Sequence, residues 1–355
     1  MSAEPSDLKK IKILFVGDLN LGTRSLLRSQ NLNDLGHEVD SISFVKLPFV
    51  QGIDKLSFLD RVLWKLKIPI DFLGYNKKII SHVKEKHYDV LWIDKGVYIY
   101  PWILKSVRQL QPQIKILSCS EDDMFARHNQ TLWYLKGLPL YDMVFTTKVY
   151  NLEELKKLGA RKTKLFLDSF DQNLHRPMSL SNEDRLKYGC DVGFIGTYEP
   201  DRAEKMLHLA NNGIVVTIYG NGWQTMVGRH PNLIVKNQPL YADEYVKFLN
   251  AAKINLCFLR KINRDQVTSR SVEIPACGGF MLGERTGRHL DFFSEGSEAE
   301  FFGDEVELLE KAKFYLTHEQ KRVIIAKNGN QRCQQSGYSM RVQVSEILKN
   351  TVSEF

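Results

Sequence analysis

The feature that most constrains the fold of this chain is a strand–helix alternation that runs along its first half and then starts again. Short apolar runs such as 10–17 and 87–96 alternate with amphipathic stretches up to about Asp168. The same order restarts at about Asp191 and continues to about Gln335. This alternation is typical of a parallel sheet with helices on both faces. We therefore predict an α/β chain with two Rossmann-like domains that face each other across a cleft.

Composition excludes several classes of protein. Hydrophobic residues make up 43% of the chain and charged residues 26%, which argues against disorder. The net charge of +7 suits anionic ligands, but the basic residues do not form an aromatic-interleaved groove, so we expect no nucleic-acid partner. Five scattered cysteines without a C-x-x-C pair indicate reduced thiols, and no export signal is recognisable, so we expect a cytoplasmic protein. No apolar run approaches the ~20 residues of a membrane span.

Ligands of open parallel sheets bind beyond the carboxyl ends of the strands, so the residues after each strand are the first candidates. In the first half, the turn from Gly17 to Gly22 has the glycine spacing of a P-loop but not its lysine. It suits an ordinary strand–helix turn or the backbone approach of a ligand, with Asp18 as a candidate polar group. A second set of acids, 121–123, follows the strand that ends near Ser120.

The acids at 121–123 allow three interpretations. They could hold Mg²⁺, because three clustered carboxylates are suitable ligands for it. They could position a substrate hydroxyl, with Asp122 and Asp123 as candidates. They could also interact with the dipole at the start of the next helix.

In the second half, glycines and arginines follow the predicted strands. Gly196 and Thr197 come after the first of them, and Arg202 lies on the helix that follows, where backbone N–H groups and a guanidinium can bind phosphate. Gly220 follows the next strand and permits either a tight turn or a close backbone approach to a base or ribose.

The stretch 264–282 carries the most specific pattern. A helix over 268–276 would place Arg270 and Glu273 on one face, which suits either an intrahelical ion pair or a diphosphate and a ribose. Gly278 and Gly279 would end that helix before a short buried strand.

These motifs resemble GT-B glycosyltransferases, in particular the CgeB-like group with a C-terminal domain of the glycosyl transferases group 1 type. The resemblance covers nearly the whole chain and is strongest from Asp191 to Glu284. The residues that carry it are 191–202, 218–223, 241–258, 268–284 and the linker-like stretch 167–177.

The resemblance implies roles for the donor-site residues. Glu273 matches the second of two glutamates that bracket seven residues in retaining relatives, where it contacts ribose. Asp265 stands at the first position, one methylene shorter, which leaves the sugar contact and the stereochemical outcome open. Arg202 and Arg270 match basic positions, and basic residues with helix N-termini neutralise a departing diphosphate in this fold. We therefore expect metal-independent transfer without a cofactor, with a nucleotide-sugar as substrate.

The resemblance also implies a domain plan. Residues 1–170 are expected to bind the acceptor, 171–190 to link the domains, and 191–337 to bind the nucleotide-sugar. Residues 338–355 are expected to form a helix that returns to the first domain. The acceptor is a sugar, a lipid-linked molecule or another hydroxyl compound.

The first domain must supply a base if the reaction inverts the anomeric centre. Asp18, Asp122 and Asp123 are the catalytic candidates. If the reaction retains the configuration, the departing phosphate can act as the base, and these acids then only position the acceptor.

A basic segment, 46–86, raises the question of a membrane. It carries eight lysines and one arginine against four acids, interleaved with apolar and aromatic residues. Such a segment could rest on the anionic inner face of a membrane, or its helix could pack on the sheet with a solvated basic face.

Two alternatives to a glycosyltransferase stay open on the residues alone. One is another activity of the same fold, a sugar phosphorylase or a nucleotide-sugar epimerase. The other is a non-catalytic module that binds a nucleotide or a glycan.

Overall fold

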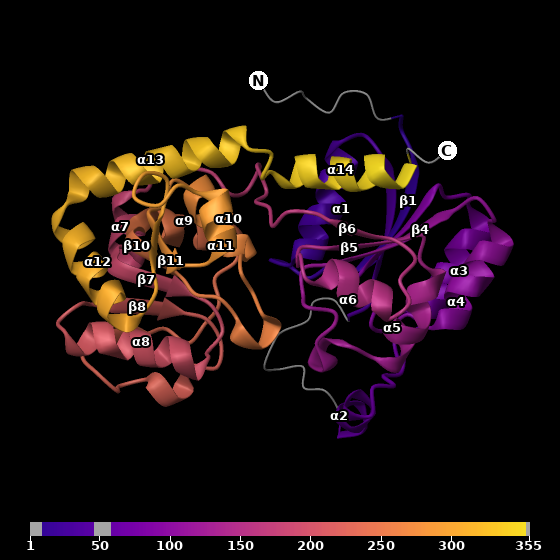
Figure 1. Ribbon diagram of the computed structural model, residues 1–355, viewed down its shortest axis with the longest axis horizontal. Helices are drawn as coiled ribbons and strands as arrows, with labels where there is room; N and C mark the ends of the chain where they lie inside the picture. Colours follow the sequence, from indigo (N-terminus) through magenta and orange to yellow (C-terminus); the bar gives the residue numbers. More distant parts are fainter. Residues whose placement is uncertain (1–8, 46–57, 353–355) are drawn as a thin grey trace. The chain divides into compact units, whose positions relative to one another are not determined.

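The chain forms two compact α/β units in the computed structural model, which describes residues 9–45 and 58–352 (Figure 1). The C-terminal unit is Asp168–Ser339, and the N-terminal unit is the described chain up to Leu167 together with 340–352. Each unit contains one six-stranded sheet, and every strand pair in both sheets is parallel. The predicted fold class, two Rossmann-like α/β domains in series, is therefore confirmed.

The N-terminal sheet has the strand order β2-β1-β3-β4-β5-β6. Its central pair has Ile13 opposite Val90 and Phe15 opposite Trp92. The chain leaves β1 toward β2 on one side and returns to β3 on the other, so the sheet has its switch point between β1 and β3. The strands are β1 (Lys12–Gly17), β2 (Glu38–Ser43), β3 (Val90–Asp94), β4 (Lys115–Ser120), β5 (Met143–Thr146) and β6 (Thr163–Leu165).

Helices cover both faces of this sheet because successive strand residues alternate between two buried clusters. Leu14 and Val16 belong to the cluster that contains Ile79 of α3, whereas Phe15 belongs to the cluster that contains Val344 of α14. The helices of the unit are α1 (Arg24–Asp34), α2 (Phe58–Lys65), α3 (Tyr75–Glu85), α4 (Pro101–Leu110), α5 (Leu132–Gly137), α6 (Asn151–Lys157) and α14 (Met340–Val352), with short 3₁₀ turns η1 (Arg127–Asn129) and η2 (Leu138–Leu140).

The C-terminal sheet has the strand order β12-β11-β10-β7-β8-β9, and its switch point lies between β7 and β10. A Cβ atom added to Gly193 of β7 would lie 2.7 Å from the ring of Phe248, so this glycine allows the helix that carries Phe248 to pack closely on the strand. The strands are β7 (Cys190–Ile195), β8 (Val216–Tyr219), β9 (Leu233–Val235), β10 (Ala252–Cys257), β11 (Met281–Glu284) and β12 (Glu300–Phe302).

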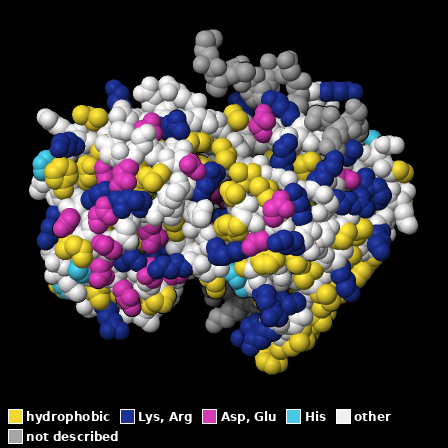
Figure 2. Space-filling model, in the orientation of Figure 1, with side chains coloured by type: hydrophobic (Ala, Val, Ile, Leu, Met, Phe, Trp, Pro, Cys, Tyr) yellow, Lys and Arg dark blue, Asp and Glu magenta, His cyan; other side chains and the backbone are white. Residues whose placement is uncertain are grey.

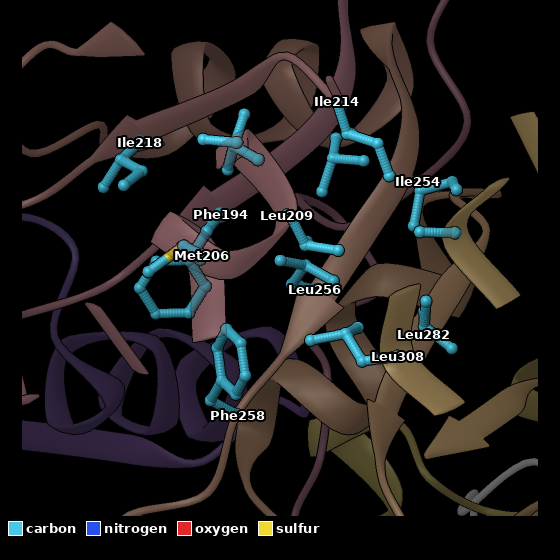
Figure 3. Packing of buried hydrophobic residues seen from close by; sticks show 14 of the residues in the cluster. Phe194, Met206, Leu209, Ile214, Ile218, Ile254, Leu256, Phe258, Leu282 and Leu308 are labelled. Carbon is cyan, nitrogen blue, oxygen red and sulfur yellow. The ribbon is translucent and has the colours of Figure 1, made fainter. Parts of the chain in front are cut away.

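One face of the C-terminal sheet packs on α8 and α12 (Figure 3). Phe194, Met206 and Leu256 are each at most 1% exposed in this core. The helices of the unit are α7 (Asn182–Tyr188), α8 (Pro200–Asn211), α9 (Ala242–Ala251), α10 (Ser269–Ala276), α11 (Gly287–Phe292), α12 (Glu305–Thr317) and α13 (Glu319–Gln335), with 3₁₀ turns η3 (Gln224–Met226) and η4 (Lys261–Asn263).

Two segments deserve comparison with the expected domain plan. The stretch 171–190, expected as a linker, lies within the C-terminal unit, where Tyr188 donates a 2.6 Å hydrogen bond to Glu244 of α9. The C-terminal unit ends at Ser339, and the helix that follows it, α14, belongs to the N-terminal unit. Leu348 of α14 is buried in one cluster with Leu32 of α1.

Candidate active site

The candidate donor-site residues of the C-terminal unit follow the two strands at its switch point. Thr197 and Arg202 come after β7, and Asp265, Arg270 and Glu273 come after β10. The connections that follow these two strands run in opposite directions along the sheet, which is the place where open α/β sheets bind ligands. The topology thus brings together residues that are up to about 75 positions apart in the sequence.

Arg202 is a buried cation whose hydrogen-bonding capacity is largely unused. Its side chain is 2% exposed and lies over the Phe194 ring, with the guanidinium carbon 5.8 Å from the ring centroid. Nη1 donates to the carbonyl oxygen of Thr197 at 3.2 Å, and Nη2 lies 3.6 Å from a carboxylate oxygen of Glu199. Within the described residues, Nε and Nη2 find no hydrogen-bond partner. Because unpaired buried donors are costly, this guanidinium is suited to an anionic ligand.

Two further arginines contribute positive charge near Arg202. Burial lowers the pKa of the Arg202 guanidinium, Glu199 opposes that effect, and Arg270 and Arg260 lower the pKa further. Arg260 is itself paired with Glu199 at 3.0 Å and is half exposed. The Nε of Arg270 is buried and, like that of Arg202, has no hydrogen-bond partner in the described part of the chain. Repulsion among these cations is relieved by binding an anion.

Glu273 lies on α10, which begins after the N-cap residue Thr268. Its side chain is largely buried, and its Oε2 accepts a 2.7 Å hydrogen bond from the Tyr245 hydroxyl of α9. His175 approaches the other carboxylate oxygen, with 3.9 Å between Nε2 and Oε1. These two neighbours hold the Glu273 carboxylate in one orientation. Burial, reinforced by Glu273, raises the pKa of Tyr245 well above its usual value, so its hydroxyl remains a donor.

The tautomer of His175 follows from its own contact with the backbone. Its Nδ1 accepts a 2.9 Å hydrogen bond from the backbone N–H of Asp171, so a neutral ring carries its proton on Nε2. That proton faces Glu273. At 3.9 Å the ring and the carboxylate are in electrostatic contact but beyond hydrogen-bond distance, and His175 is only 3% exposed.

The two glycines that follow α10 are required for different reasons, one for its backbone conformation and the other for its close packing. Gly278 has a φ of +77°, and its N–H donates to the carbonyl oxygen of Pro275. A Cβ atom on Gly279 would lie 2.8 Å from the Asn255 side chain and 2.9 Å from the Leu249 carbonyl oxygen. Both residues therefore serve the tight turn from α10 into β11.

Gly196 and Gly220 allow the loops after β7 and β8 to pack against each other. Gly220 has a φ of +144°, and a Cβ atom there would lie 1.9 Å from the carbonyl oxygen of Gly196. The same carbonyl oxygen accepts a 2.8 Å hydrogen bond from the indole of Trp223. Thr197, the next residue, is exposed. Close contact between the two loops thus requires a glycine at position 220, whereas a Cβ atom on Gly196 would lie 2.7 Å from the Phe194 ring.

Asp265 organises the loop before α10. One carboxylate oxygen accepts from the Asn263 side chain at 2.7 Å and the other from the backbone N–H of Arg260 at 3.4 Å. The intervening Arg264 has a φ of +48°, so the carboxylate supports a strained turn. The residue at the sugar-contact position of the resemblance therefore also shapes the loop that carries Arg260.

The acids of the N-terminal unit lie at the carboxyl ends of β1, β3 and β4 but differ in environment. Asp18 is partly exposed, and its Oδ1 accepts from the backbone and the side chain of Asn20 at 3.0 and 2.9 Å. Asp122 is also partly exposed and forms a 2.6 Å ion pair with Lys95. Both carboxylates remain within reach of solvent, as an acceptor-binding group must be.

Asp123 is fully buried and serves the local backbone. Its Oδ1 accepts from the backbone N–H groups of Phe125 and Ala126 and, at 2.8 Å, from the Asn151 side chain. The structure therefore separates Asp122 from Asp123, although the sequence places them side by side. This environment favours a structural role for Asp123.

A buried charge network, which the sequence analysis missed, lies beside these acids. Arg28 of α1 donates to Asp94 at 3.0 Å and to Glu121 at 2.6 Å, and Arg24 donates to Glu121 at 3.1 Å. Burial raises the pKa of Glu121, but Arg24 and Arg28 outweigh it, so the net pKa lies below the usual value. Asp94 also accepts from Ser25 at 2.7 Å. The sequence could have indicated that Arg24 and Arg28 act together, because positions i and i+4 of a helix share a face.

Across residues 9–45 and 58–352, no three His, Cys, Asp or Glu side chains are grouped as a metal ion would require. In the same ranges, no helix is both long and apolar enough to cross a membrane.

Known proteins share this architecture. Residues 202–349 match the family described as glycosyl transferase-like. Sucrose-phosphate synthase from Thermosynechococcus elongatus is similar in structure, with a TM-score of 0.70 and 12% identity over 98% of this chain and 100% of that one. Both chains have the GT-B fold. The present chain therefore has the GT-B fold, and its residues 202–349 are similar to glycosyl transferases.

Two further solved structures resemble this chain to a similar degree. HepE from Anabaena, in complex with UDP and glucose, has a TM-score of 0.64 and 15% identity over 97% of this chain and 100% of its own. An alpha-glucosyltransferase in complex with UDP has a TM-score of 0.67 and 13% identity over 96% of this chain and 100% of its own. No curated protein matches the sequence of this chain.

Proposed function

We propose that this protein is a glycosyltransferase, which moves a sugar from a nucleotide-sugar donor to an acceptor hydroxyl, and that the C-terminal unit binds the donor. The observation that carries the proposal is the buried guanidinium of Arg202, whose Nε and Nη2 have no hydrogen-bond partner in the described residues. It lies at the switch point of a parallel sheet, with Arg270 near enough to lower its pKa. A diphosphate supplies negative charge and acceptor oxygens for these N–H groups.

The donor-site residues contact different parts of the nucleotide-sugar in this proposal. Arg202 and Arg270 bind the diphosphate, and the Glu273 carboxylate accepts hydrogen bonds from ribose hydroxyls. Asp265 corresponds to the residue that contacts the sugar in the glycosyltransferases that this chain resembles. UDP and glucose are bound in the HepE structure, which makes UDP-glucose the first donor to test.

The backbone around the donor completes the site in this proposal. Gly196, Thr197 and Gly220 lie at the ends of β7 and β8, where backbone groups can approach a ligand closely. Gly278 and Gly279 fix the end of α10 and thereby the position of Glu273 on it. Their contribution is to shape the site rather than to bind through side chains.

The departing diphosphate is stabilised by arginines rather than by a metal ion. Arg202 and Arg270 supply the positive charge that Mg²⁺ supplies in other sites. The acids of the N-terminal unit are the candidates for acceptor binding. Asp18 and Asp122 are the stronger ones because their carboxylates are partly exposed, whereas Asp123 is buried.

The proposal also covers the acceptor and the subcellular location of the protein. The acceptor is a hydroxyl of a glycan, a lipid-linked molecule or another compound, and the enzyme acts in the cytoplasm. Of the basic segment 46–86, residues 46–57 lie outside the described residues, and a peripheral membrane contact through the remainder is proposed.

A thermal-shift screen followed by a turnover assay tests this function. A nucleotide that binds only the native state raises its melting temperature by mass action. We expect nucleoside diphosphates and their sugars to raise it, the matching nucleoside to raise it less, and the nucleotide-sugar to be hydrolysed slowly without an acceptor. Absence of any shift across UDP-, GDP-, ADP- and dTDP-sugars would contradict the donor assignment.

The same assay separates the alternatives, because the fold alone does not determine the reaction. A phosphorylase would release sugar phosphate from a glycan and inorganic phosphate. An epimerase would convert the donor without releasing nucleoside diphosphate. A binding module would show the thermal shift with no turnover.

A further inference from the structure

Exposed apolar side chains gather on the N-terminal unit, over α2, the segment 66–73 and α4. Figure 2 shows yellow hydrophobic and dark-blue basic side chains over the part of this unit where Figure 1 places α2, α5 and α4. We call this region the aromatic surface and define it by six exposed residues, Phe58, Leu59, Leu66, Ile70, Phe72 and Trp102.

The aromatic surface is held in place by contacts beneath it. The Trp133 indole donates a 2.9 Å hydrogen bond to the carbonyl oxygen of Pro69, and the Tyr100 hydroxyl accepts from the backbone N–H of Asp71 at 2.7 Å. Trp102 stacks on Tyr100 with 4.6 Å between ring centroids and meets Trp133 edge-on at 5.5 Å. Segment 66–73 is therefore fixed against α4 and α5, and its exposed apolar side chains belong to an ordered surface.

The exposure of these side chains is large for groups of their size. Phe58 is 76% exposed, Phe72 59% and Trp102 51%. Burying apolar area of this kind is favourable, and contiguous exposed apolar patches mark interaction sites. These exposed side chains of the described residues therefore form a candidate interaction site.

The charge on the same elements is strongly basic. Segments 58–73, 101–110 and 132–137 contain six basic residues and two acidic ones. One of the two acids, Asp71, is occupied locally, because its carboxylate accepts from the backbone N–H groups of Tyr75 and Asn76. Lys65, Lys105 and Lys136 are exposed. The surface thus combines aromatic side chains with positive charge.

These properties fit one kind of partner, and we propose that the aromatic surface docks the enzyme on an anionic lipid bilayer. Tryptophan and other aromatic side chains favour the membrane–water interface, and lysines are attracted to anionic headgroups. A second copy of the chain fits less well, since a two-fold contact through this surface would bring its lysines against each other. The inference is independent of the donor-site assignment.

Vesicle binding tests the proposal on the full chain. We expect sedimentation with vesicles that contain phosphatidylglycerol, weak sedimentation with pure phosphatidylcholine vesicles, and a blue shift of tryptophan fluorescence on binding. Increasing salt should weaken binding because the charges are exposed. Equal binding to both kinds of vesicle, or binding to neither, overturns the proposal.

Matched variants assign the binding to this surface. Ile70→Ser with Phe72→Ser, and separately Lys65→Gln with Lys136→Gln, should each weaken the partition onto anionic vesicles by about tenfold or more. The apolar control is Val323→Ser with Ile324→Ser, two exposed residues of α13. The charge control is Lys236→Gln with Lys327→Gln, two exposed lysines of the C-terminal unit.

Folding and self-association are checked on the same samples. All variants should keep the melting temperature of the parent, because the substituted side chains are exposed. Wild-type binding by both surface variants, or equal loss in the controls, overturns the assignment. A concentration-dependent dimer that only the surface variants abolish would replace the membrane with a second copy as the partner.

Discussion

The hydroxyl of Tyr245 donates a 2.7 Å hydrogen bond to Oε2 of Glu273, and this contact joins α9 to α10 beneath the candidate ribose site. His175 lies 3.9 Å from the other carboxylate oxygen and packs edge-on against the Tyr245 ring. Glu273 is therefore oriented from two sides by residues that belong to other segments. An oriented carboxylate binds ribose hydroxyls with less loss of side-chain entropy.

Tyr245→Phe should weaken donor binding while the protein stays folded. Removing one hydrogen bond to the carboxylate is expected to raise the Kd for the nucleotide-sugar about threefold to tenfold and to change kcat less. Donor titrations by calorimetry measure it. The matched control is Tyr188→Phe, which removes the 2.6 Å hydrogen bond to Glu244 in the same unit. Equal effects of the two variants would show that Tyr245 contributes only to stability.

Gly220→Ala should destabilise the C-terminal unit by about 2–4 kcal/mol. The added Cβ atom would lie 1.9 Å from the carbonyl oxygen of Gly196, and the φ of +144° is unfavourable for alanine. Gly213→Ala is the control, because Gly213 also has a positive φ, +85°, but has no atom within 4 Å of an added Cβ. Urea unfolding measures both variants, and equal losses would show that strain alone, without the contact, accounts for the effect.

Stability on the acid side should depend on the network of Glu121. Because the folded-state pKa of Glu121 is lowered, its contribution is present above the unfolded-state pKa of about 4.3 and is lost as pH falls through the folded-state value. Glu121→Gln should therefore cost stability at pH 7 and progressively less as pH falls below about 4. Urea unfolding of both proteins between pH 7 and pH 3 measures the difference. A constant difference across that range would contradict the sign of the shift.

The acids of the N-terminal unit should separate into two classes. Asp18→Asn or Asp122→Asn should reduce turnover by about 10²–10⁴-fold if the residue is the general base, with donor affinity and melting temperature unchanged. Asp123→Asn should instead lower the unfolding free energy by about 1–3 kcal/mol, because backbone donors lose a charged acceptor. Turnover, calorimetry and melting curves on the same preparations distinguish the classes.

The same series tests on the parent protein whether the proposed activity needs a metal ion. Activity should persist in EDTA, since arginines stabilise the diphosphate in the proposed site. Loss of activity in EDTA, restored by Mg²⁺, would contradict the proposal. Wild-type turnover in both Asp18→Asn and Asp122→Asn would remove these residues as candidate bases.

The strand–helix alternation was sufficient to predict two parallel sheets, because buried strands and amphipathic helices differ in their apolar period. The same pattern placed Arg202 and Arg270 after strands, which is where the structure has them. It could not reveal Tyr245 as a partner of Glu273, since the two residues are 28 positions apart and lie on different helices. Contacts of that kind depend on how helices pack, which no local spacing records.

The difference between Asp122 and Asp123 shows the same limit at one position. The sequence presents two adjacent acids after a strand, and either could face a ligand. In the structure the turn directs Asp123 inward to the backbone of Phe125 and leaves Asp122 to pair with Lys95. Which side chain points inward is set by the turn geometry and by the distant Asn151, so the pattern alone could not decide it.

The most direct test of the central claim is the affinity of Arg202→Met for UDP and for uridine, measured by calorimetry. Arg322→Met is the control, because Arg322 is another buried arginine of the C-terminal unit, on α13, and it donates to the backbone carbonyl oxygen of Tyr315. If Arg202 binds the diphosphate, its substitution should weaken UDP binding by about 1.5–3 kcal/mol and leave uridine binding nearly unchanged, and the control should change neither. Unchanged UDP affinity in a folded Arg202→Met variant would contradict the donor site proposed for this chain.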